Sequence, residues 1–332
     1  MKNIIIFQPL VIISLVLCLG ILSSPPALWG QGEDKTETGD FPYIFSVSPL
    51  AGFLYGRGEE IVYKSEKSGA YQSELLWDIK PLVYSGAVLD VFRKKSPAFF
   101  YSISLKFGFP MGTGFMEDRD WLAWNGELSH YSRHDSKAGE AWFHDFLGGI
   151  SLPFGSRVLF KPFLGLSYTH LKWIASDGYT KYGKDLGGNT YLPLEDSDRE
   201  TPQAGRIVSY TQEWLVLLFG ASLSYVFHPR FSATLSLRLS PFLYFTGVDE
   251  HHLKKMEYDD YIWGGFYLEP GGEALFSFNK RLSMGLYISW RYMKGSPHGL
   301  SYSRGNNQTY ERYLAGAAWQ TLDSGLRLIL SF

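Results

Sequence analysis

Alternation of apolar and polar residues is the feature that most limits what this chain can fold into. In residues 231–240 every odd position is apolar and every even position is Ser, Thr or Arg, and residues 282–292 repeat the pattern with the apolar residues at even positions. Successive side chains of a strand point to opposite faces, so each segment would have one apolar and one polar face. After the N-terminal segment, no apolar run approaches the roughly 20 residues that a membrane helix needs. The chain is therefore predicted to be all-β.

A soluble β-sandwich also alternates, but the connections and the C-terminus favour a membrane barrel. Short connections at 94–97, 154–156, 228–230 and 279–281 alternate with longer polar segments near 64–69, 113–137, 176–204, 247–258 and 295–309. Transmembrane barrels separate periplasmic turns from extracellular loops in this way. The chain ends on an amphipathic run whose last residue is Phe332, the usual ending of outer-membrane barrels. We predict a transmembrane antiparallel β-barrel of about ten strands with long extracellular loops and both termini in the periplasm.

The N-terminus predicts export. Lys2 precedes a long apolar stretch from Ile4 to Leu22, so residues 1–30 are expected to be a signal peptide with an approximate cleavage site, and a membrane anchor helix is the alternative. Cys18 is the only cysteine, so the mature chain would have no disulfide and no cysteine metal site. The net charge of −2 gives no basic surface for nucleic acid.

A barrel of this size is narrow. Side chains fill the interior of such barrels, whereas wide aqueous channels have about 16–18 strands, so a general porin is disfavoured. The polar strand faces include Asp78, Lys80, Arg238, Arg291 and Arg327. We expect these residues to form a network of paired charges in the lumen.

Two short stretches at the ends of predicted strands contain candidate catalytic groups. Asp118 and Asp120 are two residues apart, as are Asp249 and His251, so each pair shares one face of an extended chain with its members roughly 6–7 Å apart. The neighbouring glutamates would point away. Two carboxylates at one site cannot both ionise freely, and a histidine held by a carboxylate can act as a general base. The pairs are suited to activating a water, although solvated carboxylates or a calcium-like Asp-x-Asp pattern would give the same spacing.

Residues 116–121, 132–134 and 249–251 resemble the signature segments of the omptins, the outer-membrane aspartyl endopeptidases, and they occur in the family's order. The resemblance extends from about Phe41 to Phe332, and the similarity between the motifs is thin. It implies a barrel protease domain over residues 31–332 that hydrolyses polypeptides in the bacterial outer membrane, with the active site on the extracellular side. A non-enzymatic surface barrel on the same fold, such as an adhesin or a structural protein, is the alternative.

The resemblance also implies a role for each member of the two pairs. Asp118 and Asp120 match the carboxylate pair of the omptins, Asp249 matches the residue that orients the histidine, and His251 matches the base. In the family these pairs face each other across an extracellular groove with a water between them. No cofactor or metal is expected, because the chain has no thiolate or helical histidine pair to hold zinc.

Specificity and lipid binding are where the chain departs from the omptin pattern. Omptins prefer to cleave beside basic residues and use two acidic groups in the specificity pocket. Glu60 matches one of these groups, but Gly247 stands at the position of the second. Met116 matches an apolar wall of the same pocket. We therefore expect a weakened preference for basic residues.

Omptins also bind lipopolysaccharide through basic residues on the outer wall. Lys172 matches one of them, but Glu213 stands where an arginine is expected, so a lipopolysaccharide requirement is left open.

Overall fold

The structure, a computed structural model, describes residues 43–65, 69–93, 98–109, 114–188, 190–195, 197–297, 299–304 and 312–332. The predicted signal peptide, its cleavage site and the short connection at 94–97 lie outside these residues. All regular secondary structure in the described ranges is β-strand. Within the same ranges, no helix is long and apolar enough to cross a membrane.

The long strands form one antiparallel sheet. They are β1 (Tyr43–Tyr63), β2 (Tyr71–Arg93), β3 (Ala98–Phe109), β4 (Gly114–Asp120), β5 (His130–Phe154), β6 (Val158–Tyr182), β10 (Arg206–His228), β11 (Phe231–Ser240), β12 (Leu243–His251), β13 (Met256–Trp263), β14 (Gly265–Ser277), β15 (Leu282–Gly295), β16 (Gly299–Arg304) and β17 (Arg312–Ser331). The short strands β7 (Asp185–Gly187), β8 (Thr190–Tyr191) and β9 (Glu200–Pro202) lie in the connection between β6 and β10.

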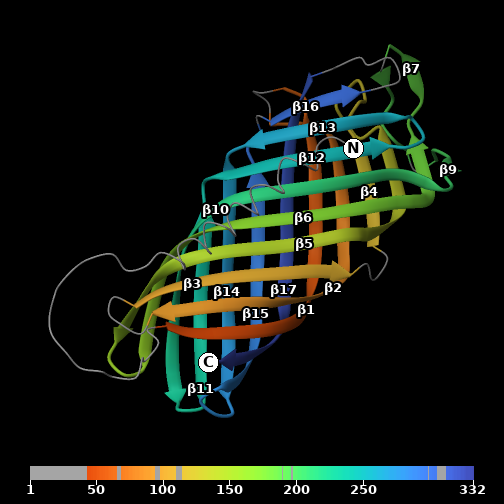
Figure 1. Ribbon diagram of the computed structural model, residues 1–332. Coiled ribbons are helices and arrows are strands. Elements are labelled where there is room, and N and C mark those ends of the chain that lie inside the picture. The colour runs from red at the N-terminus through yellow and green to blue at the C-terminus, as the bar shows by residue number, and fades with distance from the viewer. Residues whose placement is uncertain are drawn as a thin grey trace, which may run out of the picture. The chain divides into compact units, whose positions relative to one another are not determined.

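The sheet closes into a barrel, because β17 pairs with β1 and β10 pairs with β6 (Figure 1). Four strands of the ring are each broken into two segments, namely β3 and β4, β11 and β12, β13 and β14, and β15 and β16. The two segments of each broken strand pair with the same two neighbouring strands of the ring. Together with β1, β2, β5, β6, β10 and β17 they make a ring of ten strands in the described part of the chain. The predicted barrel and its strand number are confirmed.

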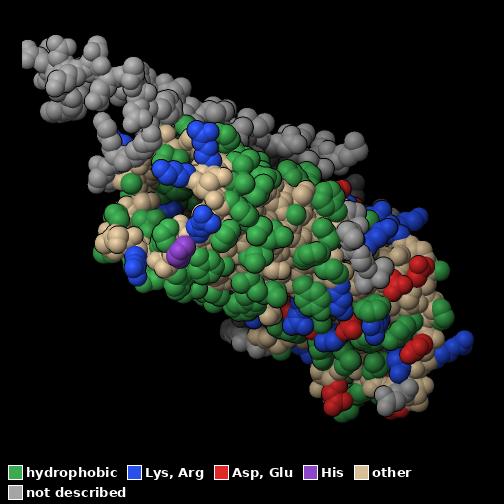
Figure 2. Space-filling view, turned by 90° about the horizontal axis from the view of Figure 1, so that it is seen from below, with side chains coloured by type: hydrophobic (Ala, Val, Ile, Leu, Met, Phe, Trp, Pro, Cys, Tyr) green, Lys and Arg blue, Asp and Glu red, His purple; other side chains and the backbone are tan. Residues whose placement is uncertain are grey.

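Apolar side chains cover a band of the outer wall. The apolar face predicted for each alternating strand is the outer face. Its exposed residues include Leu235, Leu237 and Leu239 on β11 and Leu326, Leu328 and Leu330 on β17. Figure 2 shows hydrophobic side chains over much of the visible wall, whereas acidic side chains gather toward one end. β5 and β6 have 25 residues each. A membrane-spanning strand needs only about 9–11 residues, so the barrel continues well beyond the apolar band.

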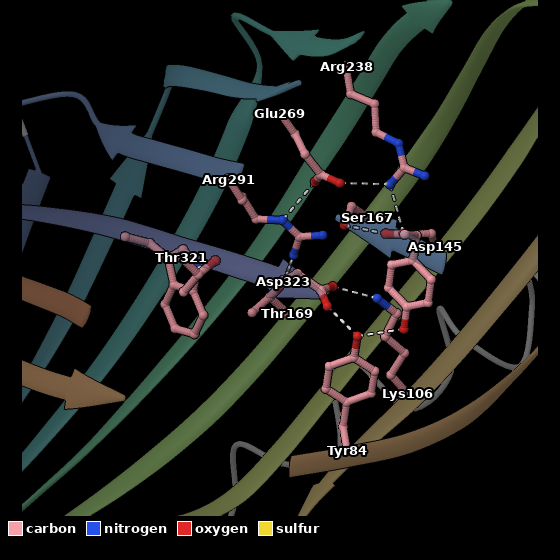
Figure 3. Close-up of polar contacts among 12 residues, drawn as sticks. Tyr84, Lys106, Asp145, Ser167, Thr169, Arg238, Glu269, Arg291, Thr321 and Asp323 are labelled. Carbon is pink, nitrogen blue, oxygen red and sulfur yellow. Dashed lines mark hydrogen bonds and ion pairs between the residues drawn. The ribbon is translucent and has the colours of Figure 1, made fainter. Parts of the chain in front are cut away.

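A network of ion pairs lines the lumen inside this band (Figure 3). A guanidinium nitrogen of Arg238 lies 3.0 Å from Asp145 and 3.5 Å from Glu269, and Nε of Arg291 lies 2.8 Å from the same glutamate. Arg327 pairs with a glutamate of β14. Buried charges are tolerated when they are paired in this way. The predicted lumenal network is therefore present for the three arginines.

Asp78 and Lys80 were predicted to join the lumenal network, and this was wrong. They alternate with Trp77 and Ile79, which are buried in the core, so their side chains lie on the outer face, where Lys80 Nζ is 2.6 Å from Asp78 Oδ2. Both Ile79 and Leu82 point inward although they are three residues apart. The β1–β2 pairing shifts register at this level, and such a bulge moves every following side chain to the opposite face.

Aromatic side chains cross the barrel above the lumenal network. The ring centroids of Trp77 and Tyr210 are 5.6 Å apart, those of Trp77 and Trp173 are 6.0 Å apart, and those of Trp173 and Trp319 are 5.9 Å apart. These side chains come from β2, β6, β10 and β17, and all have 0% exposure. We call them the aromatic floor. Aromatic rings at these separations make favourable contacts, so the aromatic floor closes the lumen with closely packed side chains.

Candidate active site

The predicted catalytic residues lie at the ends of two strands above the aromatic floor. Asp118 and Asp120 end β4, which belongs to the third strand of the ring, whereas Asp249 and His251 end β12, which belongs to the seventh. The two pairs therefore come from opposite walls of a ten-stranded barrel. Figure 1 shows β4, β12 and β13 toward the end of the barrel away from the C-terminus.

Strand alternation sets the direction of the carboxylate pair. Met116 is buried, and Asp118 and Asp120 follow it at intervals of two, so all three share the inner face of β4. Glu117 and Arg119 point to the outer face, where Arg119 Nη2 lies 2.6 Å from Glu117 Oε2. β4 is held between β2 and β5, which fixes this orientation on both sides.

The Asp249–His251 pair is formed by direct contact. Nε2 of His251 lies 2.7 Å from Oδ2 of Asp249, whose side chain is 2% exposed. The imidazole ring also packs edge-on against Tyr258, with the ring centroids 5.4 Å apart. A carboxylate that accepts the Nε2 proton selects the tautomer in which Nδ1 is free to take a proton.

The charges of the two pairs act on one another. Burial, and then the negative charge of Asp120, raise the pKa of Asp118 to about 8, although His251 opposes this shift. Burial alone would lower the pKa of His251, but the charge and hydrogen bond of Asp249 outweigh it and raise that pKa. Burial and the charge of Asp120 therefore favour the protonated form of the Asp118 carboxyl group, so this side chain can serve as an acid opposite the candidate base His251.

The residues next to His251 face the outside of the wall. Ser209 Oγ donates a hydrogen bond of 2.7 Å to Glu250 Oε2 and lies 3.0 Å from His252 Nε2. Glu250 also lies 3.9 Å from Arg206. Of the two adjacent histidines, only His251 contacts Asp249 in the described structure.

Glu60 and Met116 lie near the two candidate pairs. Glu60 is 4% exposed near the end of β1, and Met116 is 1% exposed on β4. Burial, followed by the negative charges of Asp249, Asp260 and Asp118, raises the pKa of Glu60 well above its usual range. Glu60 is therefore within electrostatic range of both walls of the site.

Asp260 is a buried acid of this site that the sequence reasoning missed. It lies on β13 with 3% exposure and pairs across the ladder with Gly247 of β12. Burial raises the pKa of Asp260 to about 7; a hydrogen bond from Ser301 opposes this rise, and the charge of Asp249 adds to it. The chain segment 247–258, predicted to be a long loop, is mostly strand, and the connection between β12 and β13 is only residues 252–255. Had that hairpin been recognised, its register would have put Asp260 opposite Gly247.

The predicted lipid-contact region lies on the outer wall of β6 and β10. Lys172 alternates with buried residues of β6 and so faces outward. The Glu213 carboxylate accepts hydrogen bonds from Tyr168 at 2.9 Å and Thr246 at 3.2 Å and lies 3.1 Å from Nδ1 of His170. An acidic, fully partnered side chain thus occupies the position where a second basic residue was expected.

Among the residues that the structure describes, no group of three or more His, Cys, Asp or Glu side chains is arranged to hold a metal ion. The candidate site is therefore a set of acids and one histidine.

Comparison with known proteins gives one strong family match. The model of the omptin family matches residues 41–329. The fold is similar to that of the outer membrane protease OmpT from Escherichia coli, with a TM-score of 0.76 and 19% identity over 90% of this chain and 100% of that chain.

Other solved structures resemble this chain far less. The transport unit of the autotransporter AIDA-I from Escherichia coli has a TM-score of 0.34 and 9% identity over 90% of this chain and 92% of its own. The toluene transporter TodX from Pseudomonas putida has a TM-score of 0.29 and 9% identity over 88% and 90%. Neither likeness supports an argument about function. No curated protein matches the chain.

Proposed function

This chain belongs to the omptin family of outer-membrane proteases, and we propose that it hydrolyses peptide bonds at the cell surface with a water held between the Asp118–Asp120 pair and the Asp249–His251 pair. The observation that carries the proposal is the 2.7 Å contact of His251 Nε2 with Asp249 Oδ2, on the wall opposite the two other aspartates.

In the proposed mechanism, Nδ1 of His251 takes a proton from the water as the water oxygen attacks the peptide carbonyl carbon. Asp249 stabilises the resulting imidazolium. The carboxyl proton of Asp118 forms a hydrogen bond to the oxyanion of the tetrahedral intermediate. The imidazolium then returns its proton to the leaving amine as the C–N bond breaks. This scheme uses no metal and no cofactor.

We propose that the site faces the extracellular side. Ser46 near the start of β1 pairs with Ser331 at the end of β17, so these two strand ends lie together at one end of the barrel. At that end β5 joins β6, β10 joins β11 and β14 joins β15 through the short connections 155–157, 229–230 and 278–281, whereas the long connection between β6 and β10 lies at the other end. The catalytic pairs lie at the other end, beyond the apolar band. Barrels of the outer membrane keep short turns in the periplasm and long connections outside.

Refolded barrel incubated with a mixed peptide library, followed by mass spectrometry, tests this function. We expect discrete cleavage sites that persist in EDTA, because water activation by Asp and His groups needs no divalent ion. A barrel that folds but cleaves no peptide would favour the non-enzymatic adhesin or structural alternative. Loss of cleavage in EDTA that zinc or calcium restores would contradict the mechanism.

A further inference from the structure

We propose that Asp260 provides the carboxylate that is missing at Gly247, so that Glu60 and Asp260 together bind the cationic side chain of an Arg or Lys residue beside the cleaved bond. This inference rests on the proposed peptidase function and names the substrate class of the same site. It replaces the sequence-based expectation that Gly247 weakens the preference for basic residues.

The first support is the register of the β12–β13 hairpin. Gly247 and Asp260 are directly opposed, and opposed residues of an antiparallel ladder point to the same face with Cβ positions about 4.5–5.5 Å apart. Asp249, two residues along β12, shares that face. The carboxylate of Asp260 can therefore lie in the part of the site that a side chain at position 247 would occupy.

The second support is that the wall is built around a glycine. A Cβ atom added at Gly247 would lie 3.0 Å from the ring of Phe245 and 3.2 Å from the hydroxyl oxygen of Tyr210. Such contacts are tighter than ordinary van der Waals packing, so a side chain at position 247 would require Phe245 and Tyr210 to shift by a few tenths of an ångström. The acidic side chain on this wall is instead Asp260 of β13, opposite the glycine.

The third support is the unmet hydrogen bonding of the two acids. Glu60 and Asp260 are 4% and 3% exposed, yet Glu60 Oε2 and Asp260 Oδ1 have no hydrogen-bond partner among the described residues. A buried polar atom without a partner is destabilising, and more so when it is charged. An ammonium or guanidinium group between the two carboxylates would satisfy both atoms.

The surrounding residues fit a long cationic side chain. Oδ2 of Asp249 contacts His251, whereas Glu60 and Asp260 have no such basic partner among the described residues; Oδ1 of Asp249 also lacks a hydrogen-bond partner there and adds negative charge beside the two acids. Met116, buried on β4 beside Asp118, offers an apolar surface for a methylene stem. The charged end of Arg or Lys would then reach the buried acids while its backbone remains near the catalytic pairs.

The test compares kcat/KM for two peptides that differ only in Arg or Gln at the residue before the cleaved bond. We expect the wild-type barrel to prefer the Arg peptide and Asp260→Asn to lower the Arg-to-Gln ratio at least about tenfold, as the loss of one close charge pair from a partly desolvated site would do. Glu60→Gln should lower it similarly. Asp259→Asn is the matched control, because Asp259 is equally buried but pairs with Arg304; its ratio should stay as in the wild type.

A wild-type barrel that cleaves both peptides equally well, or an Asp260→Asn variant that keeps the wild-type ratio, would overturn the proposal. Folding of each variant is checked by circular dichroism and by resistance of the barrel to unfolding in detergent. Direct binding of the two peptides to the His251→Ala barrel provides a second readout that does not require turnover. Preferential binding of the Arg peptide, lost when Asp260→Asn is added, would support the role of Asp260 even if the peptidase function failed, and equal binding of both peptides would refute it.

Discussion

Nε2 of His251 and Oδ2 of Asp249 are 2.7 Å apart, and the aspartate is almost completely buried. The contact has a consequence for the pH dependence of hydrolysis. Burial alone would lower the pKa of His251, and the charge and hydrogen bond of Asp249 raise it. In the proposed mechanism His251 must be neutral to accept a proton, so we expect kcat/KM to rise with pH through the pKa of His251.

Asp249→Asn should therefore reduce kcat and also move the acid limb of the kcat/KM profile to lower pH, because the charge that stabilises the imidazolium is gone. The matched control is Glu250→Gln, whose side chain lies on the outer face with Ser209. A profile that keeps its wild-type acid limb in Asp249→Asn would show that another group sets the limb.

Asp118 should set the alkaline limb. Its pKa is raised to about 8, first by burial and then by Asp120, so the proposed proton donor is present below that pH and lost as the pH rises through it. We expect kcat/KM to decline above about pH 8 in the wild type. Asp118→Asn keeps a hydrogen-bond donor that does not titrate, so its lower activity should lack this decline. An unchanged alkaline limb in that variant would rule out the assignment.

The preference for basic residues should depend on pH through Asp260. Burial raises the pKa of Asp260 to about 7, so the carboxyl group is largely neutral below that pH and charged above it. The Arg-to-Gln ratio of kcat/KM should accordingly increase as the pH rises through about 7. The ratio cancels the titration of groups that act on both peptides alike. A ratio that is flat in the wild type would contradict the role of Asp260.

Hydrolysis should not require lipopolysaccharide. The outer-wall carboxylate of Glu213 is held by Tyr168 and Thr246, so the second basic residue expected for lipid phosphate is replaced by an acid. We propose that Lys172 alone makes at most a weak contact with lipid headgroups. Barrel refolded in detergent free of lipopolysaccharide should cleave peptides, with little change on its addition. Activity that appears only after lipopolysaccharide is added would refute this expectation.

Local patterns were sufficient to predict the barrel and the strands that hold the two pairs. Alternation with a period of two identifies the outward-facing residues, such as Leu235 and Leu326, and it also places Asp118 with Asp120 and Asp249 with His251 on shared faces. These inferences need only neighbours within one strand. The aromatic floor, in contrast, consists of side chains from four strands, and no pattern within one strand predicts that they are in contact.

The errors arose where the position of a side chain depends on register. Asp78 and Lys80 were assigned to the lumen because they are charged residues of a predicted strand, but a bulge between Ile79 and Leu82 places them on the outer face, and no residue type indicates that bulge. Asp260 was missed because its place in the site depends on pairing with Gly247. That pairing can be predicted only if residues 247–258 are recognised as a short hairpin, and their polar composition had led to the prediction of a long loop.

The most direct test of the proposed chemistry compares His251→Ala with His252→Ala in peptide hydrolysis by the refolded barrel. The two residues are adjacent, but His251 contacts Asp249 whereas His252 contacts Ser209 on the outer face. We predict that His251→Ala lowers kcat at least about 10²-fold, the lower range for loss of a general base, with the barrel still folded. His252→Ala should hydrolyse the same peptides at nearly the wild-type rate. If His252→Ala is the inactive variant, or if His251→Ala keeps its activity, His251 is not the base and the proposed mechanism is wrong.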